Sequence, residues 1–195
     1  MGSSSAGLLE VFNLRWSVRS YRSDPIERDR LDRCIEAARL APSANNGQPW
    51  EFVVVGDEVV RRRLSEAARF GWIRANPFAA AAPVIVAVLE RPGHRPTRWG
   101  GRLLGRDFPL MDIGMATEHF CLQAAAEGLG TCILGLFSAR RVRNALNLPR
   151  SRRPRLLITV GRPVEDHPPQ KKRQAAALMS RYIEGKGITH ASGPQ

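Results

Sequence analysis

A chain of 195 residues that is 43% hydrophobic and 25% charged has the composition of a soluble globular protein. Its 30 lysines and arginines against 18 acidic residues give a formal charge of +12, which favours an anionic ligand such as nucleic acid or a phosphorylated cofactor. No apolar run approaches the roughly 20 residues that span a bilayer, so the composition excludes a membrane span and we expect no membrane partner.

The first half of the chain alternates between helical and strand patterns. Residues 11–14 look like the end of a helix that runs into a loop, and apolar residues at helical spacing predict an amphipathic helix at 27–40. Hydrophobic residues at 50–55 predict a strand, and a charged helix follows at 58–70. The run at 84–89 is apolar without alternation, which predicts a strand covered on both faces.

The second half begins with an irregular segment at 91–108, rich in glycine, arginine and proline, which we expect to form a lid or a disordered excursion. Asp112 can begin the next helix, because its carboxylate would lie at the positive end of the helix dipole. Gly128–Gly130 ends that helix. The remaining predicted elements are a strand at 131–134, a helix at 138–146, a strand at 156–160 and a final helix at 174–184. We expect one domain over residues 8–184, with flexible termini at 1–7 and 185–195.

The connector from Ala41 to Trp50 is the most informative stretch. Two prolines enclose a run of small hydroxyl and amide side chains, and an indole closes it. Neutral donors and acceptors on a restrained backbone suit a planar heterocycle with polar edges, such as a flavin, because they satisfy its polar atoms without burying a net charge. The alternative is an ordinary loop between helix and strand.

Two groups of cations lie near opposite ends of the chain. In an extended segment, alternate side chains share one side, so Arg15, Ser17 and Arg19 can converge on a phosphate, which guanidinium groups bind through charge-assisted hydrogen bonds. Lys171 and Arg173 offer a second pair. Taken alone, each group is better explained as a solvated charged surface. The other basic residues are spread along the chain and do not alternate with aromatic residues, so nucleic acid is not expected as a partner despite the charge.

The sequence offers no catalytic side chains. Its cysteines and histidines show neither metal-ligand spacing nor a nucleophile–base pairing, so we expect no metal, and a cofactor would supply the reactive atom. The glycine-punctuated run from Gly128 to Gly135 would let backbone amides approach such a cofactor near a flavin's reactive nitrogen, although these glycines also fit a helix C-cap.

In combination, these motifs resemble the nitroreductase family of flavin mononucleotide (FMN) oxidoreductases. The resemblance rests on the ordered series formed by 15–19, 38–50, 112–130, 160–163 and 171–173. It implies an α+β fold with a central mixed or antiparallel sheet flanked by helices, assembled as an intertwined homodimer with FMN at the subunit interface. It also implies a cytoplasmic enzyme in which the segment 91–108 shapes the substrate pocket.

The resemblance also assigns cofactor contacts to particular residues. Arg15, Ser17 and Arg19 match positions at the phosphate and one flank of the ring, and Lys171 and Arg173 match the later phosphate-binding cations. Trp16 belongs to the same segment but stands where an arginine is common. The stretch against the ring near its reactive nitrogen is Ile133, Leu134 and Gly135. The segment that reaches the flavin from the partner subunit is Pro42, Ser43, Ala44, Asn46 and Gln48.

The implied reaction passes a hydride from NADPH or NADH through FMN to a small organic acceptor by a ping-pong mechanism. A nitroaromatic, a quinone or an activated alkene would serve as acceptor. Within the same fold, reductive dehalogenation or fragmentation of the flavin is the main alternative. A non-catalytic flavin-binding or nucleic-acid-binding protein is the alternative of a different class.

Overall fold

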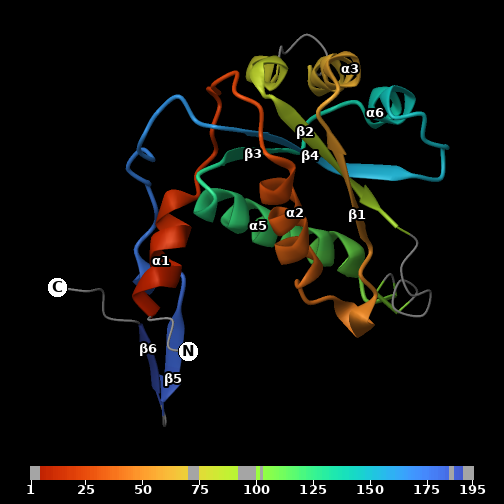
Figure 1. Cartoon of the computed structure of the whole chain (residues 1–195). Helices are drawn as coiled ribbons and strands as arrows, with labels where there is room; N and C mark the ends of the chain where they lie inside the picture. The colour runs from red at the N-terminus through yellow and green to blue at the C-terminus, as the bar shows by residue number, and fades with distance from the viewer. Residues whose placement is uncertain (1–4, 70–74, 92–99, 102, 185–186, 191–195) are drawn as a thin grey trace.

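The computed structural model describes residues 5–69, 75–91, 100–101, 103–184 and 187–190. A four-stranded antiparallel sheet forms the centre, in the order β1-β2-β4-β3. Helices cover both faces of the sheet, while α1 and the β5–β6 hairpin extend away from it (Figure 1). The strands are β1 (Trp50–Val55), β2 (Val84–Glu90), β3 (Gly130–Leu134), β4 (Arg153–Gly161), β5 (Arg181–Glu184) and β6 (Gly187–His190).

The α-helices are α1 (Ser5–Leu14), α2 (Arg28–Arg39), α3 (Glu58–Ala68), α5 (Phe108–Ala126) and α6 (Ala139–Ala145). Short 3-10 turns lie at η1 (Ala44–Asn46), η2 (Pro77–Ala81) and η3 (Ala176–Leu178). α2 and α5 cover one face of the sheet, and α3 and α6 cover the other (Figure 1). The central strand β2 is therefore buried at every position, as its continuous apolar sequence predicts.

Alternation along β2 divides the interior into two hydrophobic layers. Val86 and Val88 join the layer beneath α2 and α5, whereas Ile85 and Leu89 join the layer beneath α3 and α6. Each fully buried aliphatic side chain stabilises the fold by roughly 1.5–3 kcal/mol. The burial of β2 on both faces thus agrees with its hydrophobic pattern.

An arginine fork joins α2 to the end of α5. Arg33 donates from Nε and Nη2 to the two carboxylate oxygens of Glu127, at 2.7 and 2.8 Å. This bidentate bond is the main reason that the pKa of Glu127 falls to about 2. The position of α5 relative to α2 is therefore set by charge as well as by apolar contact.

The three cysteines are buried in these layers as free thiols. Burial raises the pKa of Cys34 and of Cys121 to about 12 and raises that of Cys132. Cys34 and Cys121 fall within apolar helical patterns of the sequence, which predict small core residues, and their burial agrees with that prediction.

Two predicted elements are wrong. The helix expected from Asp112 begins at Phe108, where Asp107 accepts a hydrogen bond from the Leu110 amide at 3.2 Å and caps the helix. The helix expected at 174–184 is replaced by η3 and the β5–β6 hairpin. The β-branched residues of the two strands, Ile183, Ile188 and Thr189, favour extended structure, and this outweighs the helix-forming alanines before them. Half of the irregular segment 91–108, namely 92–99 and 102, lies outside the described residues.

Candidate functional site

The segment containing Arg15, Ser17 and Arg19 is attached to the edge strand β3. Ser17 forms a parallel bridge with Thr131, and the Val18 amide donates to the Thr131 carbonyl at 3.0 Å. Val18 is completely buried, and a Cβ at Gly130 would lie 2.8 Å from the Val18 Cβ. The glycine therefore permits the close approach that fixes this segment against β3.

Arg15, Ser17 and Arg19 all act on the thiol of Cys132, and their convergence on one phosphate stays a prediction. Burial raises the pKa of the Cys132 thiol, and Arg19, Arg15 and a hydrogen bond with Ser17 act in the opposite direction. The Arg19 guanidinium also lies over the Phe78 ring, 5.8 Å from the centroid, in a cation–π contact.

The cations near the two ends of the chain meet. Lys171 donates from Nζ to the Phe12 carbonyl at the end of α1. Burial lowers the pKa of Lys171, and repulsion from Arg15 and Arg173 lowers it further. One carboxylate approaches this group, since Arg15 Nε lies 3.3 Å from Glu118 Oε1. We call Arg15, Lys171 and Arg173 the cation cluster, and its excess positive charge is suited to a phosphate.

The predicted amide-bearing loop lies elsewhere in the subunit. In Figure 1, η1 and α1 lie near opposite ends of α5, so residues 42–48 are separated from the cation cluster. Within the loop, the Gln48 amide donates to Ser43 Oγ at 3.0 Å, and Gln48 Nε2 donates to Asn46 Oδ1 at 2.9 Å. Pro42, Asn46 and Gln48 are exposed, and Ser43 and Ala44 are half-buried. The loop presents its amide groups outward.

At the end of β3, the side chain of Ile133 and the backbone at Gly135 are open to a ligand. Ile133 is 37% exposed, and a Cβ at Gly135 would meet no atom within 4 Å. Leu134 is buried in the layer beneath α3 and α6, so its side chain faces away from the surface that Ile133 occupies. From Leu134, only the backbone could contact a ligand beside Ile133.

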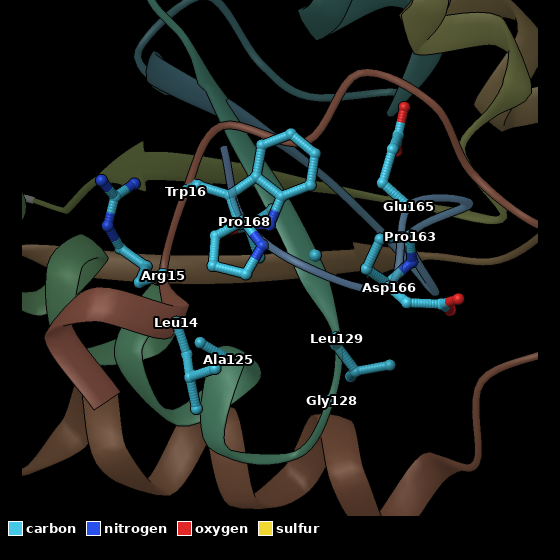
Figure 2. A pocket seen from close by; sticks show the side chains of 12 residues that line it. Leu14, Arg15, Trp16, Ala125, Gly128, Leu129, Pro163, Glu165, Asp166 and Pro168 are labelled. Carbon is cyan, nitrogen blue, oxygen red and sulfur yellow. The ribbon is translucent and has the colours of Figure 1, made fainter. Parts of the chain in front are cut away.

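Trp16 faces away from Arg15. Figure 2 shows its indole within a cavity of about 120 Å³, while the Arg15 guanidinium points away from that cavity. Pro163 and Pro168 line the cavity beside the indole. Asp166 at the rim accepts a hydrogen bond from Arg22 at 3.0 Å. The structure thus places Trp16 on a different side of its segment from the predicted phosphate ligands.

Asp112, which contacts the loop at 42–48, was assigned the wrong role from the sequence. Asp112 lies in the second turn of α5, is 5% exposed, and accepts the Ala44 amide at 3.2 Å to each carboxylate oxygen. Burial raises its pKa, and the bond from Ala44 opposes that shift. An acidic residue among the buried positions of a helix was the signal available in the sequence.

None of the described helices is long and apolar enough to cross a membrane. The antiparallel sheet between two helical layers places the chain in the α+β class of folds. A profile of the nitroreductase family matches residues 14–77 and 71–162. The chain belongs to the nitroreductase family.

Individual relatives agree with this assignment. An NADH dehydrogenase of Thermus thermophilus is 31% identical over 181 residues, covering 81% of this chain and 87% of the relative. A 5,6-dimethylbenzimidazole synthase of Rhodospirillum rubrum is 30% identical over 178 residues, covering 83% and 84%. The crystal structure of a nitroreductase family protein from Clostridium novyi superposes with a TM-score of 0.71 at 28% identity, covering 80% and 84%. The predicted family and α+β fold class are confirmed, and membership supports an oxidoreductase.

Proposed function

We propose that this protein is an FMN-dependent oxidoreductase that passes a hydride from NADH or NADPH to a small organic acceptor. The cation cluster carries the proposal, because Lys171 Nζ bonds the carbonyl of Phe12, three residues before Arg15, and burial together with Arg15 and Arg173 lowers the pKa of Lys171. An anion among these cations would relieve that repulsion. The residues therefore fit the phosphate end of FMN.

Other groups of the chain are suited to the rest of the cofactor. Ser17 and Arg19 lie beside the cluster and would hold its near flank, and the backbone from Ile133 to Gly135 would lie along the ring. Bound FMN would supply the chemistry by accepting a hydride and passing it on. The protein's own role is to bind the phosphate, orient the ring and limit access of water.

We also propose a homodimer, in which residues 42–48 of one protomer complete the site of its partner. Exposed apolar side chains gather on α1 and α5, where Leu9 is 61%, Phe12 42%, Met111 55% and Met115 39% exposed. Exposed apolar groups on neighbouring elements are typical of an interface. Substituting Met115→Glu should give monomers in analytical ultracentrifugation with weakened FMN binding, and an unchanged dimer would contradict the proposed interface.

The spectrum of the purified protein tests the activity. A flavin absorption band that bleaches on anaerobic addition of NADH or NADPH would support both cofactor and donor. Substituting Arg19→Ala should weaken FMN retention more than fold stability, because the side chain is exposed and its proposed partner is the ligand. A colourless protein that cannot take up FMN, and that shifts DNA at physiological salt, would favour the nucleic-acid alternative.

One relative favours a second candidate function. The 5,6-dimethylbenzimidazole named in the Rhodospirillum rubrum protein contains the dimethylbenzene ring that is also part of a flavin, which favours flavin fragmentation over dehalogenation as the alternative. Turnover assays with nitroaromatics, quinones and halogenated phenols, together with product analysis of the flavin after aerobic incubation, separate these activities. Loss of the flavin without acceptor turnover would reverse the ranking. We place the enzyme in the cytoplasm.

A further inference from the structure

Asp112 is a buried carboxylate of unusual environment. The described part of the chain buries two acidic side chains, Glu90 and Asp112, at 4% and 5% exposure. Glu90 accepts a hydrogen bond from Arg155 Nε at 2.7 Å. Asp112 instead accepts the Ala44 amide with both oxygens at 3.2 Å. Burial of a carboxylate beside a backbone amide costs stability that a cation partner would have offset.

The loop that Asp112 reaches is conformationally strained. Asn45, Asn46 and Gln48 have φ angles of 51°, 52° and 41°, in the left-handed region that asparagine tolerates better than glutamine. Residues in this region cost of order 1–3 kcal/mol each and persist only where surrounding contacts hold them. The bond from Ala44 connects this strained loop to the rigid helix α5.

We propose that Asp112 is a positioning residue, whose carboxylate holds the Ala44 amide and thereby keeps the 43–48 loop in the conformation that meets the flavin. This inference rests on the proposed function, which places the same loop at the cofactor. An ionised carboxylate makes a stronger hydrogen bond to an amide than a neutral side chain does. The residue therefore favours loop order at the expense of fold stability.

The pKa of Asp112 agrees with a residue that orders the 43–48 loop and lowers the stability of the fold. It is raised by burial and lowered by the Ala44 bond, and no charged group of the described part of α2, β1 or η1 contributes. Replacing the carboxylate with a neutral amide removes the cost of burying a charge while weakening the bond. Stability and flavin affinity should consequently change in different directions, which an ordinary structural role does not predict.

The test compares Asp112→Asn and Asp112→Ala with the matched variant Asp107→Ala. Asp107 lies beside the same helix and accepts one backbone amide, that of Leu110, at 3.2 Å, so its loss weakens α5 without touching the loop. Three quantities are measured for the intact protein: hydrogen exchange of amides 43–48 without FMN, the dissociation constant for FMN, and the midpoint of urea unfolding.

Both Asp112 variants should accelerate exchange at 43–48 and raise the FMN dissociation constant about tenfold, the loss expected for a charge-assisted hydrogen bond. The urea midpoint of Asp112→Asn should equal or exceed that of the wild type. Asp107→Ala should lower the urea midpoint and leave both loop exchange and FMN affinity unchanged. Adding Ser43→Ala to Asp112→Ala should weaken FMN binding little further, because both changes release the same loop.

The outcomes separate this inference from the proposed function. Unchanged exchange at 43–48 in Asp112→Ala would overturn the positioning role, whatever happens to FMN. Faster exchange with unchanged FMN affinity would overturn the connection between the loop and the flavin. If Asp107→Ala and Asp112→Ala changed the exchange at 43–48 and the FMN dissociation constant equally, general weakening of α5 would explain both variants. That result would also overturn the positioning role of Asp112. A wild-type protein that binds no FMN would contradict the proposed function, and the exchange measurement alone would then decide the role of Asp112.

Discussion

Substituting Lys171→Met should separate cofactor binding from fold stability. The folded protein holds the Lys171 proton less tightly than the unfolded chain does, because burial and the neighbouring Arg15 and Arg173 disfavour its charge. The charged side chain therefore opposes folding when no anion is bound. This destabilisation is relieved as rising pH removes the proton from the folded protein. Methionine should leave the FMN-free protein at least as resistant to urea as the wild type.

The same substitution should weaken FMN binding about 10- to 150-fold. Lys171 would donate one charge-assisted hydrogen bond to the phosphate, worth about 1.5–3 kcal/mol, and each 1.4 kcal/mol is a factor of about ten in the dissociation constant. Two of the three cations of the cluster would remain, so binding should be reduced rather than abolished. The loss should shrink as salt rises, because the partly exposed charges are screened.

Titration of flavin fluorescence measures the dissociation constant, and thermal unfolding with and without inorganic phosphate measures the anion response. Lys172→Met is the matched control, because the neighbouring Lys172 is exposed and carries the same charge. The wild type and the control should be stabilised by phosphate more than Lys171→Met. Equal FMN affinity in the two variants would refute the reasoning that the cluster, rather than the overall charge, binds the anion.

Three further predictions concern the fold. Arg155→Met removes the Nε donor that lies 2.7 Å from the buried carboxylate of Glu90 and should lower the free energy of unfolding by about 3 kcal/mol. The control Arg152→Met breaks the ion pair with Glu51, whose side chains are 35% and 36% exposed, and should cost under about 1 kcal/mol. Equal losses in urea titration would contradict this difference. Gly130→Ala places a Cβ 2.8 Å from that of Val18 and should reduce both stability and FMN affinity, and Val18→Ala in the same chain should not restore the wild-type values because alanine keeps the Cβ that is approached; an unaffected single variant would show that the close approach is unimportant. The pKa of Glu127 is lowered from 4.5 to about 2, so its contribution to stability should be lost as pH falls through that window. The urea midpoint of Glu127→Gln should therefore depend less on pH in this window than that of the wild type. An equal pH dependence of the two proteins would contradict this prediction.

The secondary structure of the central sheet could be predicted because each strand carries its own local pattern. β1 was predicted with the observed bounds, and β2 differs by one residue, since both are short apolar runs bounded by turn residues. Antiparallel pairing and strand order were not available from local pattern. The final hairpin failed because residues 174–178 have helix-forming composition, and the pairing between β5 and β6 is a contact that periodicity does not report.

The cations near the two ends of the chain could be connected from the sequence only through the family resemblance. The resemblance to the nitroreductase family assigned Arg15 and Lys171 to the phosphate. In the structure Lys171 bonds the carbonyl of Phe12, three residues before Arg15, and their joint contact with a phosphate stays a prediction. Asp112 was given a helix-capping role because an aspartate before an apolar helical pattern usually has one. Its true partner, the Ala44 amide, lies 68 residues away, and only the packing of η1 against α5 reveals the bond.

The burial of all three thiols affects how fast they would be oxidised in an enzyme of the proposed kind. A thiol is oxidised mainly through its thiolate, and with pKa values near 12 at Cys34 and Cys121 that form is scarce at neutral pH. Reduced flavins leak electrons to oxygen and release peroxide beside the polypeptide. An enzyme of the proposed kind would carry its sulfur in a form that such by-products attack slowly, and thiol-specific reagents would count these cysteines only after the chain unfolds.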